Sequence, residues 1–179
     1  MQEFVDSIET SLKDKNYHAA LFVALSLPDI CGKIDELGEQ SKARFVQWYD
    51  TYVKKYYCKE DGTCTLSGSD CYALRCAFLH EGGDDVGGLR SQDVVEKFEF
   101  VVITPVITYH NVASDGGAKL QLNVVDFCKD VVRACNEWLD VIKGANDKQQ
   151  QLGAMLSIRN LNDEDPYRGG ENPPDWRQK

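Results

Sequence analysis

Apolar side chains recur every three to four residues in five stretches of this chain, which is the pattern of amphipathic helices. The clearest stripe lies within residues 42–57, where charged residues fall off the apolar face. An aromatic stripe can also stack nucleic-acid bases, but packing into a core is the favoured interpretation. The stripe consists of Phe45, Trp48, Tyr49, Tyr52, Val53 and Tyr56. The expected helices cover about 2–14, 17–27, 42–57, 70–81 and 126–143.

The period of the pattern changes near residue 97. Apolar and polar residues alternate there and again over 120–124, with Asp115-Gly116-Gly117 as a turn between them. These features predict a two-stranded β-hairpin over about 97–125, to which Val106 to Val112 would contribute. The expected fold is therefore mainly α: a helical bundle, residues 1–145, with a β-hairpin inserted before the last helix. The polar residues 146–179 are expected to form a flexible tail.

Helix boundaries are expected where the local chemistry favours them. Pro28 should interrupt the second helix, because proline lacks the amide donor that a helix needs. Ser41 is a candidate cap for the third helix, and Ser69 or Asp70 for the fourth. Gly82-Gly83 should end the fourth helix with a left-handed cap.

Composition narrows the classes of partner. The formal net charge is −9 and the sequence pI is about 4.8. Sequence-blind binding to nucleic acid depends on lysine and arginine, so any nucleic-acid site should be a small cleft or one assembled between subunits. The chain shows neither a secretory signal pattern nor an apolar run of about 20 residues. The expected location is cytoplasmic, with no membrane segment.

The seven cysteines leave several interpretations open. Buried free thiols in a reducing cytosol are favoured, and Cys58 could pair with Cys64 under oxidation. Alternatively, a purely structural protein could hold zinc, although the spacings differ from the paired Cys-x2–4-Cys pattern. No metal or cofactor is otherwise expected. The zinc alternative would use Cys58, Cys64, Cys71 and Cys76, with His80 nearby.

Arg75 and His80 form the pair of residues best suited to chemistry. On an ideal helix, residues five apart differ in direction by about 140°, but a long arginine side chain can swing toward a histidine at the helix end. The carboxyl end of a helix favours the protonated imidazole of a residue such as His80. A guanidinium suits phosphate, and an imidazole can move a proton. Such a pair is sufficient for metal-independent RNA cleavage.

Other ionisable residues have simpler interpretations. His110 is expected to be a hydrogen-bonded strand residue, and His18 a surface residue. Asp29, Asp35 and Glu36 can supply a carboxylate to a cleft, but solvated charges at helix ends are the default expectation.

The segment Leu74-Arg75-Cys76-Ala77-Phe78-Leu79-His80 resembles the R-x4–6-H motif of the HEPN superfamily, all-helical RNases and nucleotide-binding domains. The stretch from Leu27 to Gly32 agrees with the same branch, found in bacterial and plasmid-borne proteins. The resemblance covers roughly residues 1–145. It departs from many active members at Cys76, where they carry Asn, Asp or His.

The resemblance implies a homodimer in which two motif helices face one cleft, with Arg75 and His80 as active residues. It also implies a toxin or phage-defence role, RNA as substrate, and a cognate antitoxin protein as a possible partner. The alternative is a non-catalytic module of the same fold that binds a nucleotide or a partner protein. Fold alone does not decide between them.

Overall fold

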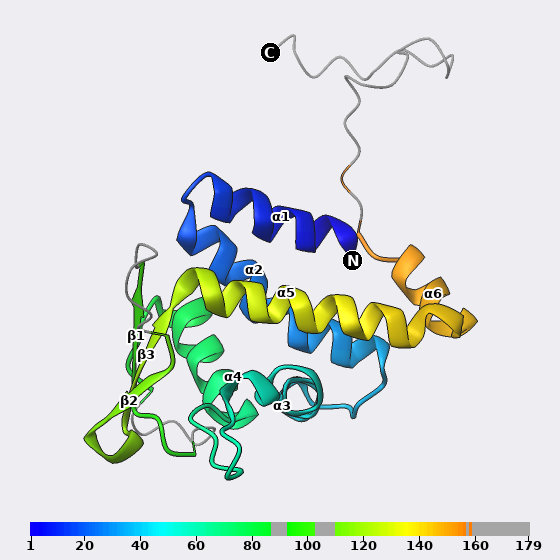
Figure 1. Ribbon diagram of the computed structural model, residues 1–179. Coiled ribbons are helices and arrows are strands. Elements are labelled where there is room, and N and C mark those ends of the chain that lie inside the picture. Colours follow the sequence, from blue (N-terminus) through cyan, green and yellow to red (C-terminus); the bar gives the residue numbers. More distant parts are fainter. Residues whose placement is uncertain (87–92, 103–109, 157, 159–179) are drawn as a thin grey trace, which may run out of the picture.

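A computed structural model describes residues 1–86, 93–102, 110–156 and 158. The described part is mainly helical, as expected, with a small sheet at one end of the helices (Figure 1). Its α-helices are α1 (Gln2–Lys13), α2 (Tyr17–Ile34), α3 (Ser41–Tyr52), α4 (Gly68–Cys76), α5 (Val124–Val141) and α6 (Asn146–Gly153). The short helical turns are η1 (Lys54–Tyr57), η2 (Ala77–Glu81), η3 (Asp115–Gly117) and η4 (Ile142–Gly144). The strands are β1 (Lys97–Val101), β2 (Val112–Ser114) and β3 (Lys119–Asn123).

The aromatic stripe of α3 packs into the core. Phe45, Trp48 and Tyr49 are fully buried, and the Trp48 ring meets the Trp138 ring of α5 edge-on, with centroids 6.4 Å apart. Edge-on packing is a favourable arrangement for buried aromatic rings. The preference for core packing over base stacking is therefore confirmed for this stripe.

Pro28 does not interrupt α2, so that prediction is wrong. The helix runs from Tyr17 to Ile34, and Pro28 is buried within it. One helical turn later, α2 passes close to α3: a Cβ atom added at Gly32 would lie 2.7 Å from the carbonyl oxygen of Arg44. Burial against neighbouring helices thus outweighs the one hydrogen bond that proline removes.

The sheet differs from the predicted hairpin. β1 pairs with β3 in parallel, from Lys97 opposite Lys119 to Val101 opposite Asn123. Among the described strands, β2 and β3 alone form an antiparallel hairpin, and the strand order is β1-β3-β2. Alternation of apolar residues reveals which face of a strand is buried but not its direction, which explains the error. Most of the proposed 106–112 continuation lies outside the described residues.

The start of α4 is fixed by side-chain hydrogen bonds. The N-cap is Ser67, not Ser69 or Asp70, and its hydroxyl oxygen accepts from the Asp70 amide at 3.0 Å. The buried Asp70 carboxylate accepts in turn from the amides of residues 93–95, at 2.7 to 3.1 Å. This clamp joins α4 to the segment that leads into β1. Ser41 also lacks the predicted capping bond and instead donates to Asp29.

The segment expected to be a flexible tail begins with a helix. Residues 146–153 form α6, and its Lys148 ammonium donates to Asp35 at 2.5 Å. Because the same carboxylate accepts from Trp138 Nε1 at 2.7 Å, α6 is tied to the bundle. Residue 157 and residues 159–179 lie outside the described part. No helix in the described ranges combines the length and apolar character that crossing a bilayer requires.

Candidate functional site

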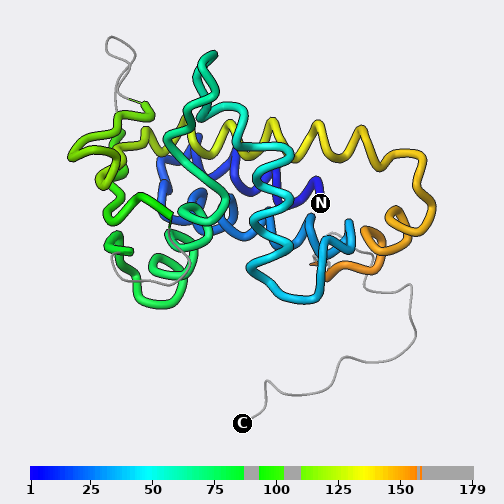
Figure 2. The backbone as a smooth tube through the Cα atoms, turned by 90° about the horizontal axis from the view of Figure 1, so that it is seen from below, coloured from blue at the N-terminus to red at the C-terminus, as the bar shows by residue number. Residues whose placement is uncertain are grey.

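Arg75 and His80 are brought together by the structure. Arg75 lies in the last turn of α4 and His80 in η2, and the guanidinium Nη1 is 3.1 Å from the imidazole Nε2. Figure 2 shows that the segment following α4 lies on the side of the molecule opposite α5, so α5 does not cover it. His80 is exposed, whereas Arg75 is half-buried.

A π-helical turn accounts for this contact. The residues of η2 continue α4 with wider, i→i+5 spacing, and Gly82 ends it at φ 69°, in the left-handed region. The Gly83 amide bonds to the Ala77 carbonyl at 3.2 Å, and the Gly82 amide bonds to the Phe78 carbonyl at 3.1 Å. Each bond spans one residue more than in the usual glycine cap of an α-helix. The extra residue turns His80 back toward Arg75, and such turns recur at functional sites.

The contact fixes the hydrogen-bonding role of the imidazole. An arginine always donates, so Nε2 of His80 must accept, and the ring proton of the neutral form lies on Nδ1. A group that competes for the guanidinium would release the Nε2 lone pair.

Among the described residues, no carboxylate neutralises the charge of Arg75. No ion pair joins it to an acidic residue in the described part of the chain. Its Nε is buried without a hydrogen-bond partner among those residues. The guanidinium carbon lies 5.9 Å from the ring centroid of Tyr72, one helical turn earlier. Stacking on an aromatic face stabilises a cation without consuming its donors.

Tyr72 is a site residue that spacing alone did not reveal. Its ring meets Phe45 edge-on at 5.3 Å. Desolvation by burial raises the pKa of the Tyr72 phenol, the neighbouring Ser41 lowers it, and Cys76 acts in the raising direction. The phenol therefore stays neutral and polar beside Arg75. Its position three residues before Arg75 was the available signal, because such residues share a helix face.

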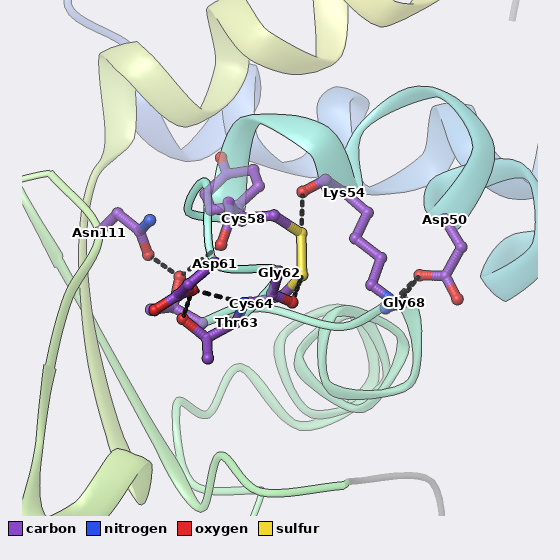
Figure 3. Close-up of a disulfide and its surroundings, with 11 residues drawn as sticks. Asp50, Lys54, Cys58, Asp61, Gly62, Thr63, Cys64, Gly68 and Asn111 are labelled. Carbon is purple, nitrogen blue, oxygen red and sulfur yellow. Dashed lines mark hydrogen bonds and ion pairs between the residues drawn. A yellow bond between two sulfur atoms is a disulfide. The ribbon is translucent and has the colours of Figure 1, made fainter.

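The Cys58–Cys64 pair corrects the expectation of free thiols. These two residues form a disulfide, where the chain reverses between η1 and α4 (Figure 3). They face each other as an antiparallel bridge with Cα atoms 4.0 Å apart, and the Lys59 amide bonds to the Thr63 carbonyl at 2.8 Å. This tight reversal supplies the geometry that loop placement in a sequence cannot show.

The disulfide also removes two ligands from the zinc alternative. No cluster of three or more metal-ligating side chains occurs in the described part. The five other cysteines are free thiols, and burial raises the pKa of the Cys128 thiol to about 12. Burial likewise raises the pKa of Cys71. Protonated, enclosed thiols such as these are poor nucleophiles.

His18 is a surface residue as expected, and His110 is hydrogen-bonded as expected but does not lie in a strand. His110 Nδ1 accepts a hydrogen bond from the Asn123 amide at 3.2 Å, and its Nε2 lies 3.5 Å from Asp130. It lies just before β2 rather than within it. His18 is exposed, and its ring lies nearly parallel to that of Phe78, with an interplanar angle of 22°.

Two of the three acidic residues considered as solvated helix-end charges are instead partly buried and form ion pairs. Asp29 accepts from Arg44 at 3.1 Å, and Asp35 from Lys148. Glu36 is exposed. None of the three has a hydrogen bond or an ion pair to Arg75 or His80 in the described part of the chain. The candidate site therefore rests on Arg75, His80 and Tyr72.

Searches against protein-family models, curated proteins and solved structures find no match to this chain.

Proposed function

We propose that this protein is a metal-independent endoribonuclease of the HEPN type, acting as a homodimer. Arg75 is the residue that stabilises charge on the phosphate, and His80 is the acid–base residue. The observation that carries the proposal is the 3.1 Å contact between an exposed imidazole and a guanidinium that has no carboxylate partner among the described residues. A toxin or phage-defence role, with a cognate antitoxin, follows from the resemblance.

The geometry supports a specific reaction. An RNA phosphate competes for the Arg75 guanidinium, which releases Nε2 of His80 to accept the proton of the ribose 2′-hydroxyl. The 2′-oxygen forms a bond to phosphorus as the bond from phosphorus to the 5′-oxygen breaks. The proton passes from an imidazolium to the leaving 5′-oxygen. The products are a 2′,3′-cyclic phosphate and a 5′-hydroxyl, and the guanidinium stabilises the intervening phosphorane.

A homodimer supports this chemistry in two ways. It places one His80 as base and a second as acid, and it concentrates two arginines on a chain whose net charge is −9. Phe22 of α2 supports a dimer interface at this face. Its ring packs on Phe78 of η2, with centroids 4.6 Å apart, yet it is 41% exposed in the single chain, and a second subunit would cover it. Phe22→Glu is expected to shift the protein to a monomer in light scattering, with Val141→Glu as a control at a distant exposed residue.

The proposal is tested by incubating the purified dimer with single-stranded RNA in EDTA. His80→Ala is expected to reduce cleavage about 10²- to 10⁴-fold, and Arg75→Ala about 10²- to 10³-fold. His110→Ala is the control histidine and should retain cleavage per folded molecule. Cleavage that survives both site substitutions would exclude the pair. A wild-type dimer that binds RNA without cutting it would favour the non-catalytic module.

A further inference from the structure

A pocket lies beside η2, the turn that carries His80. Its volume is about 510 Å³, within the range of small-molecule sites, and it is lined by the start of α2, the end of α4 with η2, and the end of β1. Phe78, Gly82 and Gly83 contribute to its wall, whereas Arg75, His80 and Phe22 do not. The pocket is therefore separate from the Arg75–His80 contact but built from the same turn.

The chain places the pocket next to the pair. Leu74 and Phe78, one turn apart, face the pocket, and Arg75 directly follows Leu74. His80 lies between two lining residues, Phe78 and Gly82. The pocket and the Arg75–His80 pair are therefore built from interleaved residues of α4 and η2.

The lining combines aromatic rings with one acidic group. His18 and Phe78 present nearly parallel rings, with centroids 6.2 Å apart. Asp84 stands at the rim, and its backbone carbonyl accepts from the Phe98 amide at 2.9 Å, which ties it to β1. No hydrogen bond or ion pair of the Asp84 carboxylate occurs within the described ranges. As far as the described residues go, both oxygens can accept from a ligand.

We propose that this pocket binds a guanine base of single-stranded RNA, and this inference rests on the proposed function. Unpaired RNA bases are recognised by stacking on aromatic side chains and by hydrogen bonds along their edges. Guanine presents two adjacent N–H donors, N1–H and N2–H, which match the two oxygens of one carboxylate. Adenine, cytosine and uracil lack that pair of donors. The pocket therefore selects the nucleotide whose phosphate reaches Arg75 and His80.

Gly83 offers a way to close the pocket without disturbing the turn. A Cβ added there meets no atom within 4 Å, and unlike Gly82 the residue has no positive φ. Gly83→Leu should fill the cavity. Gly144→Leu is the matched control, since Gly144 has the same open surroundings in η4, which does not line this pocket. Asp84→Asn changes the rim alone and keeps the backbone bond to β1.

The test titrates the four ribonucleoside 3′-monophosphates into the wild-type protein and the three variants, by calorimetry, and maps RNA cleavage in parallel. Guanosine 3′-monophosphate is expected to bind about tenfold more tightly than the others. Asp84→Asn should abolish that preference, Gly83→Leu should weaken binding about tenfold or more, and Gly144→Leu should match the wild type. Cleavage should concentrate beside guanosine and lose this preference in Gly83→Leu and Asp84→Asn.

The outcomes separate the two proposals. Equal affinity for all four nucleotides, no binding of any, or guanosine binding that Gly83→Leu and Asp84→Asn leave unchanged would overturn the base pocket, whatever the cleavage result. Selective guanosine binding in a protein that cuts no RNA would support the pocket and overturn the nuclease. If Gly83→Leu fails to fold, the Asp84→Asn comparison decides the pocket by itself.

Discussion

The two halves of α2 face different kinds of neighbour. In the C-terminal half, Asp29 pairs with Arg44 of α3, and Asp35 pairs with Lys148 of α6. Asp35 also accepts from the buried Trp138 indole. Asp29 and Asp35 thus each have a cationic partner, as expected of groups that hold a fold together.

The N-terminal half of α2 instead contacts η2, the turn that carries His80. His18 and Phe22 contact Phe78 through their rings. The Arg75 guanidinium just beyond has an imidazole and a phenol ring as neighbours and no carboxylate in the described part. The two arginines therefore differ: Arg44 forms an ion pair that joins α2 to α3, whereas no carboxylate in the described ranges pairs with Arg75.

Breaking the Arg44 pair should produce the largest change in stability. Arg44 and Asp29 are only 14% and 21% exposed, so Arg44→Ala leaves a largely buried carboxylate unpaired. The free energy of unfolding should fall by about 2–3 kcal/mol. Urea denaturation followed by tryptophan fluorescence measures this loss. The matched variant Arg75→Ala should lose less than about 1 kcal/mol, and equal losses would erase the distinction between the arginines.

Gly82 should have a smaller effect that reaches the site. Gly82→Ala puts a side chain at φ 69° and should cost about 1 kcal/mol. Because Gly82 closes the turn that carries His80, cleavage should fall more than stability alone explains. Gly83→Ala, at an ordinary φ, is the control. Cleavage and unfolding measured on both variants test this, and identical behaviour would show that the left-handed cap does not position His80.

The free energy of unfolding should depend slightly on pH through the Asp35–Lys148 pair at the C-terminal end of α2. The hydrogen bond to Asp35 raises the pKa of Lys148. A raised folded-state pKa contributes stability that is present below the pKa of the unfolded lysine and is lost as pH rises through the folded value. Since the pair is partly exposed, the loss should be a fraction of about 1 kcal/mol, and it should appear only as the pH rises above about 10, near the pKa of an unfolded lysine. Urea titrations should show it in the wild type and not in Lys148→Met.

The sequence predicted most of the helical architecture, for a physical reason. Residues such as Ile8, Trp48 and Trp138 mark buried faces by spacing alone, and all three are fully buried. Features that depend on distant partners were missed. Helix α2 continues through Pro28 because neighbouring helices enclose it. The parallel pairing of β1 was missed because an alternating pattern does not encode strand direction.

The candidate site was predictable in identity but not in geometry. The spacing and the resemblance singled out Arg75 and His80, yet an ideal α-helix would set them about 140° apart. A π-helical turn, closed by Gly82, brings them within 3.1 Å. The Asp70 clamp depends on tertiary contacts and could not be derived from spacing. The contact of Tyr72 with Arg75 lies within α4, and its i, i+3 spacing was a signal in the sequence.

The chemistry of the product ends tests the central claim most directly. RNA cut by the wild-type dimer in EDTA should carry 2′,3′-cyclic phosphate and 5′-hydroxyl ends, because the 2′-oxygen is the proposed nucleophile. A substrate with a single 2′-deoxy nucleotide at the mapped cleavage position should remain intact there. Products with 5′-phosphate ends, or cleavage at the deoxy position, would contradict the assignment of Arg75 and His80.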